Sequence, residues 1–390
     1  MNREIAITGV GEVPSGNYPD RSVLGQALDA SMEAIANAGL EKEQIDAILP
    51  ASSFHDSWYN TDQIFSMYVE ELGLQGEVQT NAQVTSGGAS SASLMKMARG
   101  LIQEGEADNV LIVHSEKFSE LDFEDAIDVF ATLGIPRQWE APYGINYNAI
   151  GGFMTERYKH ETGASEEDVA SVCVSNREWA KDNPNAMFQD DLTLEEVVES
   201  EMIASPLHAY ECNVLADGAS ALVVSDSDIG ERFTDDIAYL DSHGGTVTHY
   251  SISQEADVTR FGWEEAANKA FRDSDIDRED IDAAQIYDSY PVVNLIALEE
   301  MGFVERGEAG KYVREGHTEP GGELPMTTNG GMLSQGHTGA GGGIAVLVEC
   351  ARQLMGDAGD RQIPDLTNAV ETAVGGTYMD AQVSIYTNER

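Results

Sequence analysis

The chain has 390 residues, 42% of them hydrophobic, which is enough to fill the cores of two domain-sized units. It carries 22 Lys and Arg against 69 Asp and Glu, so its formal net charge at pH 7 is −47. A charge of this sign excludes a general nucleic-acid binder and argues against docking on anionic membranes.

The acidic residues are scattered over predicted helix faces rather than gathered in a tail, so the charge belongs to the whole surface. At molar salt the Debye length falls to about 3 Å, which screens the repulsion that such a charge causes in dilute buffer. The sparse lysines favour a halophilic protein over an ordinary acidic one. No basic start followed by an apolar stretch precedes the first strand, and no apolar run reaches membrane-spanning length, so we expect a cytoplasmic protein.

Strands and helices alternate along the chain. In order, the patterns predict a strand at residues 5–11, a helix at 23–38, a strand at 45–52, a helix at 62–71, a strand at 77–82, a helix at 89–104 and a strand at 109–115. This alternation predicts an α/β fold with parallel strand pairing in a layered sheet. The three cysteines, Cys173, Cys212 and Cys350, lie far apart without CxxC spacing, so we expect no metal site and no disulfide framework.

A long insertion, roughly residues 116–216, interrupts this order before the strand SALVVSD. It contains the aromatic segment IPRQWEAPYGINYNAIGG and two predicted helices, at 152–162 and 166–182. Long loops in compact domains are usually lids or binding walls, although a surface helical appendage is the alternative.

The second half of the chain repeats the first. AIANAGLEKEQIDAIL and KAFRDSDIDREDIDAAQI match in register, pairing Ala34 with Ala270 and Ile45 with Ile281. Farther on, SGGASSASLMKMARGLI resembles TGAGGGIAVLVECARQLM, each a Gly-rich turn that leads into a helix. We therefore expect a duplicated α/β unit, with residues 1–230 as the N-terminal half and 231–390 as the C-terminal half.

Several segments, in this order, resemble the thiolase superfamily, specifically its sterol-carrier-protein-X-like and archaeal acetyl-CoA acetyltransferase branch. They include GGASSASLMKMARGLIQEGEADNVLIVHSEKFS, IYDSYPVVNLIALEEMGFVERGEAGKYV, PMTTNGGMLSQGHTGAGGG and AVGGTYMD. The resemblance implies an archaeal acyl-CoA enzyme with a thiolase fold of five layers, α-β-α-β-α, whose catalytic loops meet where the two halves join. It also implies a homodimer or higher oligomer and a possible OB-fold and zinc-ribbon partner subunit. Coenzyme A enters as the substrate thioester, and no other cofactor is expected.

The family's nucleophilic cysteine, in a C-x-S-G turn, has no counterpart here. The matching turn is Val84-Thr85-Ser86-Gly87, which places a valine at the thiol position. Ser86 lies where a helix N-terminus stabilises negative charge, so it is a candidate nucleophile if a base lies within hydrogen-bond reach. The alternative is that Ser86 only caps the helix.

Three further motifs carry candidate catalytic groups. His337 matches the histidine of the family's G-H-P turn, and an imidazole suits a base near neutral pH. Tyr287 and Tyr290 replace the first and last residues of the family's H-D-C-F motif; a phenol is an acid or base there, or a packed aromatic. Gly336, Gly375 and Gly376 are candidates for backbone contact with a thioester oxygen.

The phosphates of coenzyme A need cations, and Arg137 and Arg157 of the insertion are candidates by location, with Lys159 beside them. The resemblance predicts a thiolase-type acyltransferase that makes or cleaves a 3-oxoacyl-CoA, with Ser86 as nucleophile and His337 as base. Two alternatives remain: a cofactor-independent retro-aldolase acting on a 3-hydroxyacyl-CoA, which the tyrosine at position 287 suits, and a non-catalytic acyl-CoA-binding subunit.

Overall fold

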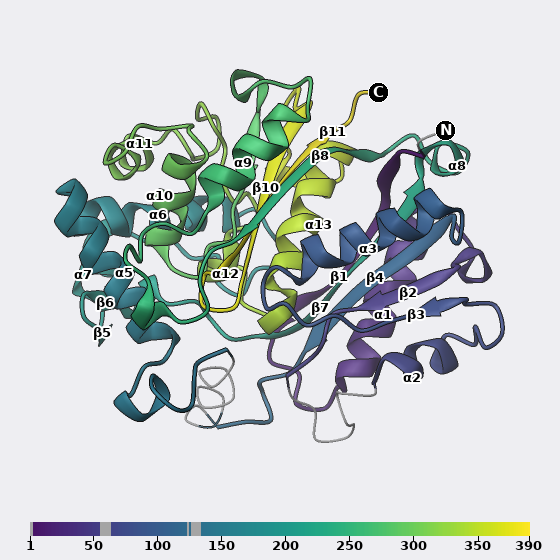
Figure 1. Ribbon diagram of the computed structural model, residues 1–390, viewed down its shortest axis with the longest axis horizontal. Helices are drawn as coiled ribbons and strands as arrows, with labels where there is room; N and C mark the ends of the chain where they lie inside the picture. The colour runs from purple at the N-terminus through teal and green to yellow at the C-terminus, as the bar shows by residue number, and fades with distance from the viewer. Residues whose placement is uncertain (1–2, 55–63, 123–124, 126–133) are drawn as a thin grey trace.

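The computed structural model describes residues 3–54, 64–122, 125 and 134–390. Its main sheet has the strand order β3-β2-β4-β7-β1-β8-β11-β10-β9 (Figure 1). The strands are β1 (Ile5–Gly16), β2 (Ala47–Pro50), β3 (Thr80–Asn81), β4 (Asn109–Glu116), β7 (Asp217–Asp226), β8 (Ala238–Val247), β9 (Ala283–Gln285), β10 (Asn368–Gly375) and β11 (Asp380–Thr387). A small second sheet pairs β5 (Met202–Ala204) with β6 (Leu207–His208) inside the insertion.

Helices separate and cover the two halves of this sheet. They are α1 (Val23–Asn37), α2 (Ile64–Glu71), α3 (Ser90–Glu104), α5 (Tyr147–Thr162), α6 (Glu166–Ala180), α7 (Leu194–Glu199), α8 (Ser227–Gly230), α9 (Trp263–Arg272), α10 (Pro291–Glu300), α11 (Ala309–Arg314), α12 (Gly331–Ser334) and α13 (Gly342–Met355). The expected helix at residues 62–71 is α2, and Asp62 lies outside the described residues.

The layers follow from which faces these helices cover. α3 and α13 contact each other and the strands of both halves, whereas α1 covers β1 and β7 and α9 covers β8 and β11 on the outer faces (Figure 1). The order is therefore α-β-α-β-α, so the predicted fold class is confirmed. The equivalent helices α3 and α13 form the central layer, and their N-terminal turns meet there.

The expectation of parallel pairing was wrong for most of the sheet. β2 runs parallel to β3 and β4, and β9 runs parallel to β10, but β1 is antiparallel to both β7 and β8. β10 and β11 are antiparallel because residues 376–379 alone connect them, and a connection this short cannot carry the crossover that parallel strands require.

The insertion is packed into the molecule and is not a surface appendage. Ile150, Met154 and Tyr158 of α5 are buried in the same hydrophobic cluster as Trp263 of α9 and Ile296 of α10. Both predicted helices exist, and each has a side-chain cap at its start, Asn146 for α5 and Ser165 for α6. Helices α5 and α6 of the insertion therefore pack against the C-terminal half.

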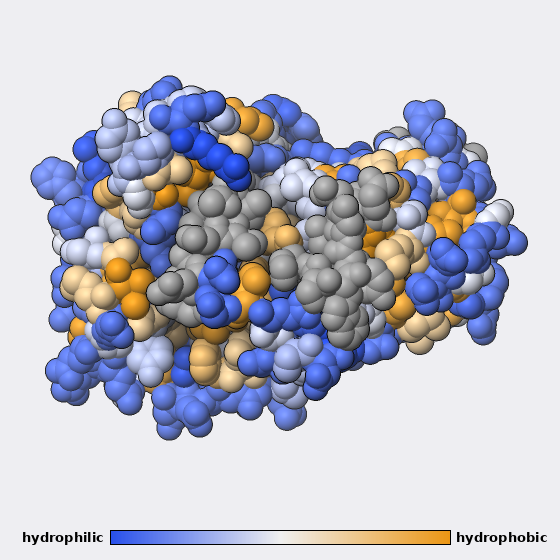
Figure 2. All heavy atoms as spheres, turned by 90° about the horizontal axis from the view of Figure 1, so that it is seen from below, coloured by the Kyte–Doolittle hydropathy of each residue, from blue (hydrophilic) through white to orange (hydrophobic). Residues whose placement is uncertain are grey.

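Hydrophilic side chains surround much of the face shown in Figure 2, in agreement with a net charge of −47. The dependence on high salt that this charge predicts stays a prediction. Among the described residues, no helix is both long and apolar enough to cross a membrane.

Candidate active site

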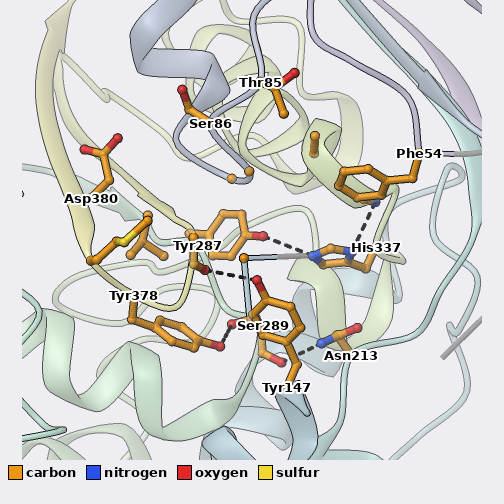
Figure 3. Close-up of a pocket in the computed structure, with 18 of the residues that line it drawn as sticks. Phe54, Thr85, Ser86, Tyr147, Asn213, Tyr287, Ser289, His337, Tyr378 and Asp380 are labelled. Atoms are coloured by element: carbon orange, nitrogen blue, oxygen red, sulfur yellow. Dashed lines mark hydrogen bonds between the residues drawn. The ribbon is translucent and has the colours of Figure 1, made fainter. Parts of the chain in front are cut away.

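A cavity of about 350 Å³ lies where four separate turns meet in the centre of the molecule (Figure 3). The turns are those before α3, after β9, before α13 and between β10 and β11. Their lining residues are Thr85, Ser86, Gly87, Gly88, Tyr287, Ser289, Tyr290, His337, Gly339, Ala340, Val374, Gly376, Tyr378, Met379 and Asp380, and Phe54, Gly134, Tyr147 and Asn213 complete the wall. The turns of both halves thus contribute to one site.

Tyr287 and His337 form a hydrogen-bonded pair inside this cavity. Tyr287 Oη lies 3.1 Å from His337 Nε2, and both side chains are buried. Burial lowers the pKa of His337 to about 3, so its ring is neutral at neutral pH. Burial also raises the pKa of Tyr287 above its usual value, followed in importance by the nearby Tyr147 and Asp288.

A backbone contact fixes the tautomer of His337. The N–H of Gly339 donates to His337 Nδ1 at 3.2 Å, so Nδ1 carries no hydrogen. The neutral ring must then carry its hydrogen on Nε2, which donates to Tyr287 Oη. The phenol keeps its own hydrogen and its remaining lone pair for a substrate, and an Nε2–H aimed at the oxygen stabilises a phenolate.

The main chain of His337 is held on both sides by the end of the insertion. Its N–H donates to the carbonyl of Val214 at 2.6 Å, and its carbonyl accepts from the N–H of Ala216 at 3.1 Å. Asp288, the residue after Tyr287, holds the short helix α12 that precedes His337. Its buried carboxyl group accepts from Met332 N–H at 2.8 Å and from Asn176 Nδ2 at 2.7 Å. Burial raises the pKa of Asp288 to about 8, and the side chain secures α12 rather than lining the cavity.

The turn before α3 makes room for the Tyr287 ring. A Cβ atom added to Gly88 would lie 2.3 Å from Tyr287 Cε2, so only glycine fits beneath the phenol. The Tyr287 N–H donates to Thr372 Oγ1 on β10 at 3.1 Å, which fixes the backbone from the other side. Two segments far apart in the sequence therefore position one hydroxyl group.

Ser86 lines the cavity but is not paired with His337. Its Oγ accepts a long hydrogen bond of 3.4 Å from Ser93 Oγ, and its side chain points away from the Tyr287–His337 pair (Figure 3). The helix cap expected as the alternative is not made either: the residue before α3 is Ala89, without a side-chain cap, and the Ser86 N–H instead donates to Ser90 Oγ at 3.0 Å.

The other candidate residues fall into three groups. Tyr290 is fully buried and its hydroxyl donates to Asn148 Oδ1 at 2.8 Å, so it forms part of the wall. Gly376 lines the cavity and its carbonyl accepts from Tyr147 Oη at 3.3 Å. Gly336 and Gly375 are outside the lining, where Gly336 faces Ser15 and Ala216.

The cations chosen from the insertion lie outside the cavity. Arg137 is exposed, Arg157 pairs with Glu161 along α5, and Lys159 pairs with Glu166 at 3.1 Å. None of the three lines the cavity, so their contact with coenzyme A stays a prediction.

Six polar lining residues were not among the predicted site residues: Thr85, Tyr147, Asn213, Ser289, Tyr378 and Asp380. Ser289 Oγ and Tyr378 Oη lie 2.6 Å apart, and Tyr378 has a φ of 63°, which is rare for an aromatic residue. Tyr147 and Tyr378 stand inside or next to segments that were already singled out, INYNAIGG and GGTY, so the aromatic residues there were the available signal.

A second cavity of about 580 Å³ adjoins the first. Both are lined by Tyr147, Asn213 and Tyr290, which therefore stand between them. The remaining wall of the second cavity is mainly apolar or uncharged and includes Phe118, Leu121, Met187, Ile203 and Cys212.

Sequence comparison identifies this architecture. The model of the thiolase N-terminal domain matches residues 8–228, and that of the thiolase C-terminal domain-like family matches residues 244–388. The chain belongs to the thiolase family.

Relatives of two kinds align over nearly the whole length. An acetyl-CoA acetyltransferase of Methanothermobacter thermautotrophicus is 29% identical, covering 98% of this chain and 99% of its own. A steroid side-chain-cleaving aldolase of Thermomonospora curvata is 30% identical, covering 95% of each chain. Among solved structures, the Ltp2-ChsH2(DUF35) aldolase superposes with a TM-score of 0.85 at 28% identity, covering 98% of this chain and 97% of its own.

The thiol of a thiolase is absent from this site. Val84 is half-buried, packs against a hydrophobic cluster to which both halves contribute, and does not line the cavity. The chain's three cysteines also lie outside the lining of this cavity, and only Cys212 reaches the second one. The site of this family member is therefore built around a phenol and an imidazole.

Proposed function

We propose that the protein is a carbon–carbon lyase that cleaves a 3-hydroxyacyl-CoA by a retro-aldol reaction, without an acyl-enzyme. The observation that supports this most is the buried Tyr287–His337 hydrogen bond of 3.1 Å, in a cavity whose lining contains no thiol. This chemistry needs one group to accept and return a proton, whereas thiolase chemistry also needs a nucleophile.

In the proposed reaction Tyr287, as its phenolate, accepts the proton of the substrate's 3-hydroxyl group. The bond between C2 and C3 breaks, C3 becomes a carbonyl carbon, and the electron pair moves into the thioester enolate. The same phenol then returns the proton to C2, which gives acetyl-CoA or a 2-substituted acyl-CoA. The Nε2–H of His337 stabilises the phenolate and so offsets the effect of burial on the tyrosine.

The two cavities suit the two products. The first, with about 350 Å³ around the pair, takes the thioester carbonyl and C2. The second, with about 580 Å³ and a largely apolar wall, takes the substituents of C3 that leave as a ketone or aldehyde. Substrates with a large apolar group on C3 are therefore expected to react faster than 3-hydroxybutyryl-CoA.

The similarity to an acetyl-CoA acetyltransferase supports a second candidate, acyl transfer through Ser86 with His337 as base. Its requirements are less well met, because Ser86 Oγ points away from the ring and His337 Nε2 carries a hydrogen. A third candidate is a non-catalytic subunit that binds acyl-CoA, which would also explain a cavity without a cysteine.

We also propose that the chain works with another subunit. The aldolase with the TM-score of 0.85 is named together with a DUF35 protein, which supports a partner subunit. We propose that this partner is of the OB-fold and zinc-ribbon type and that the chain forms a homodimer or higher oligomer. The protein is therefore best purified in molar KCl together with any subunit that remains bound to it.

The deciding experiment supplies 3-hydroxyacyl-CoA thioesters and follows the products by mass spectrometry. We expect acetyl-CoA and a carbonyl compound in equal amounts, without consumption of free CoA and without a mass increase on the protein. An acyl adduct on Ser86, together with CoA-dependent cleavage of a 3-oxoacyl-CoA that Ser86→Ala abolishes, would support the acyltransferase. Binding of the thioester with neither reaction would support the non-catalytic subunit.

A further inference from the structure

A second histidine, His114 on β4, is buried directly beneath the turn that carries His337. Its Nε2 lies 2.7 Å from the carbonyl oxygen of Thr338. Because a carbonyl oxygen only accepts, Nε2 carries the hydrogen and donates. Burial lowers the pKa of His114 to about 4, so the ring is neutral at neutral pH.

The group that His114 holds is the same peptide that fixes the His337 tautomer. The carbonyl of Thr338 and the N–H of Gly339 are the two ends of one planar peptide unit. The N–H end donates to His337 Nδ1 at 3.2 Å. The carbonyl end also accepts from the N–H of Gly341 at 3.1 Å, so the plane of this peptide is held from two directions.

The imidazole and the turn are packed so closely that not even one carbon atom fits between them. A Cβ atom on Gly341 would lie 1.8 Å from His114 Cδ2, and one on Gly339 would lie 2.8 Å from Glu116 Oε2. The Glu116 carboxylate itself accepts from the N–H of Phe54 at 2.8 Å and of Lys117 at 3.2 Å. His114 and Glu116 of β4 therefore support the turn at two glycines, Gly339 and Gly341.

We propose that His114 is a positioning residue for the Tyr287–His337 pair. Three hydrogen bonds run in one direction: His114 Nε2–H to the Thr338 carbonyl, the Gly339 N–H to His337 Nδ1, and His337 Nε2–H to Tyr287 Oη. Bonds in such a chain polarise one another, so each donor strengthens the next. The chain begins on β4 and ends on the oxygen that is to carry negative charge.

The kinetic part of this inference rests on the proposed function, but its structural part does not. The structural part states that His114 keeps His337 in the Nε2–H tautomer, which is observable in the protein without any substrate. The two parts can therefore fail separately.

The test compares His114→Gln with His114→Met. Both side chains are unbranched and similar in length, but only the glutamine has an N–H group to donate to Thr338. We expect His114→Met to lower kcat about tenfold with KM within about twofold, where tenfold corresponds to about 1.4 kcal/mol. The rise of log(kcat/KM) with pH should move to higher pH, because the Tyr287 phenolate loses stabilisation. His114→Gln should restore most of kcat and the original pH profile.

Nitrogen NMR of protein labelled with ¹⁵N-histidine measures the tautomer directly, with the His337 signal assigned by its loss in His337→Asn. We expect the Nε2–H form in the unmodified protein and in His114→Gln, and a mixture of tautomers in His114→Met. An unchanged tautomer in a folded His114→Met would overturn the inference, whatever the enzyme does. Equal loss of kcat in both variants with an unchanged pH profile would also overturn it, since His114 would then only fill space. If His114→Met does not fold, loss of the Nε2–H form in His114→Gln is the overturning result.

If the tautomer responds as expected but no variant cleaves a 3-hydroxyacyl-CoA, the proposed function fails and the positioning role stands.

Discussion

The turns before α3 and before α13 are equivalent parts of the two halves, yet only the second places an ionisable side chain in the cavity. The second turn supplies His337, held by backbone contacts on both sides. The first turn has Val84 where the resemblance to the thiolase superfamily predicts a cysteine, and it contributes Gly88, whose missing Cβ leaves room for the Tyr287 ring. The same element thus places an imidazole in the cavity in one half and, in the other half, leaves space for the Tyr287 ring.

Removing the phenol hydroxyl tests this division most strongly. Tyr287→Phe should lower kcat for retro-aldol cleavage by about a thousandfold, within the range of a lost general acid–base. Tyr239→Phe is the matched control, because it removes a surface hydroxyl that lies 3.0 Å from Glu231, far from the cavity. Steady-state rates of acetyl-CoA formation measure both. A Tyr287→Phe variant that keeps a tenth of the activity would remove the phenol from the mechanism.

A phenolate base predicts that the rate of the same reaction rises with pH. Burial raises the pKa of Tyr287, so the phenolate is the minor form at neutral pH. Below that pKa the phenolate fraction increases tenfold per pH unit, and kcat/KM should therefore rise with pH with a slope near one. A rate that falls as pH rises from 7 to 9, at constant salt, would contradict a phenolate base.

The supporting role of the first turn is tested by adding one carbon atom. In Gly88→Ala the new Cβ would lie 2.3 Å from the Tyr287 ring and would displace it. Since a misplacement of about 1 Å costs about a hundredfold, we expect kcat to fall by that order. Gly100→Ala, on the helix α3 that follows this turn, is the control: its Cβ meets nothing within 4 Å, so activity should stay and stability should rise by about 1 kcal/mol.

These tests also separate what the sequence predicts from what it leaves open. The order of the motifs, through the resemblance to the thiolase superfamily, was enough to predict the layered fold and to nominate His337 and Tyr287. Both residues line the cavity, and their catalytic roles stay predictions. The contact of Gly88 with Tyr287 joins residues about 200 positions apart, and the bond from Gly339 to His337 depends on the direction of one peptide. Such relations follow from packing and from the geometry of the folded chain, which no periodicity in the sequence encodes.

The two turns should also differ in how they respond to acid. Burial lowers the pKa of His337 to about 3, whereas an unfolded histidine titrates near 6.5. Below pH 6.5 the unfolded state binds the proton and the folded state does not, so His337 destabilises the fold by about 1.4 kcal/mol per pH unit. The free energy of unfolding of the wild type relative to His337→Asn should thus fall by about 2 kcal/mol between pH 6.5 and 5.

Denaturant titrations in molar KCl measure this difference, and the other titrating groups cancel between the two proteins. Ser86→Ala, in the turn without a titratable group, should change the free energy of unfolding by the same amount at both pH values. A pH-independent difference for His337→Asn would mean that the folded and unfolded states bind this proton with the same pKa, so that burial does not lower the pKa of His337.

Placing a thiol at position 84 should have the smallest effect on activity of all these substitutions. Val84→Cys is close to isosteric, so stability should change by less than about 1.5 kcal/mol. The position packs against the hydrophobic cluster shared by the two halves and does not line the cavity, and His337 Nε2 already directs its hydrogen to Tyr287. The new thiol therefore meets no base and no substrate carbonyl, and we expect CoA-dependent cleavage of a 3-oxoacyl-CoA to stay at the wild-type background. Thiolysis with an acyl group on residue 84, detected by peptide mass, would show instead that the loss of one sulfur atom alone separates this site from an acyltransferase.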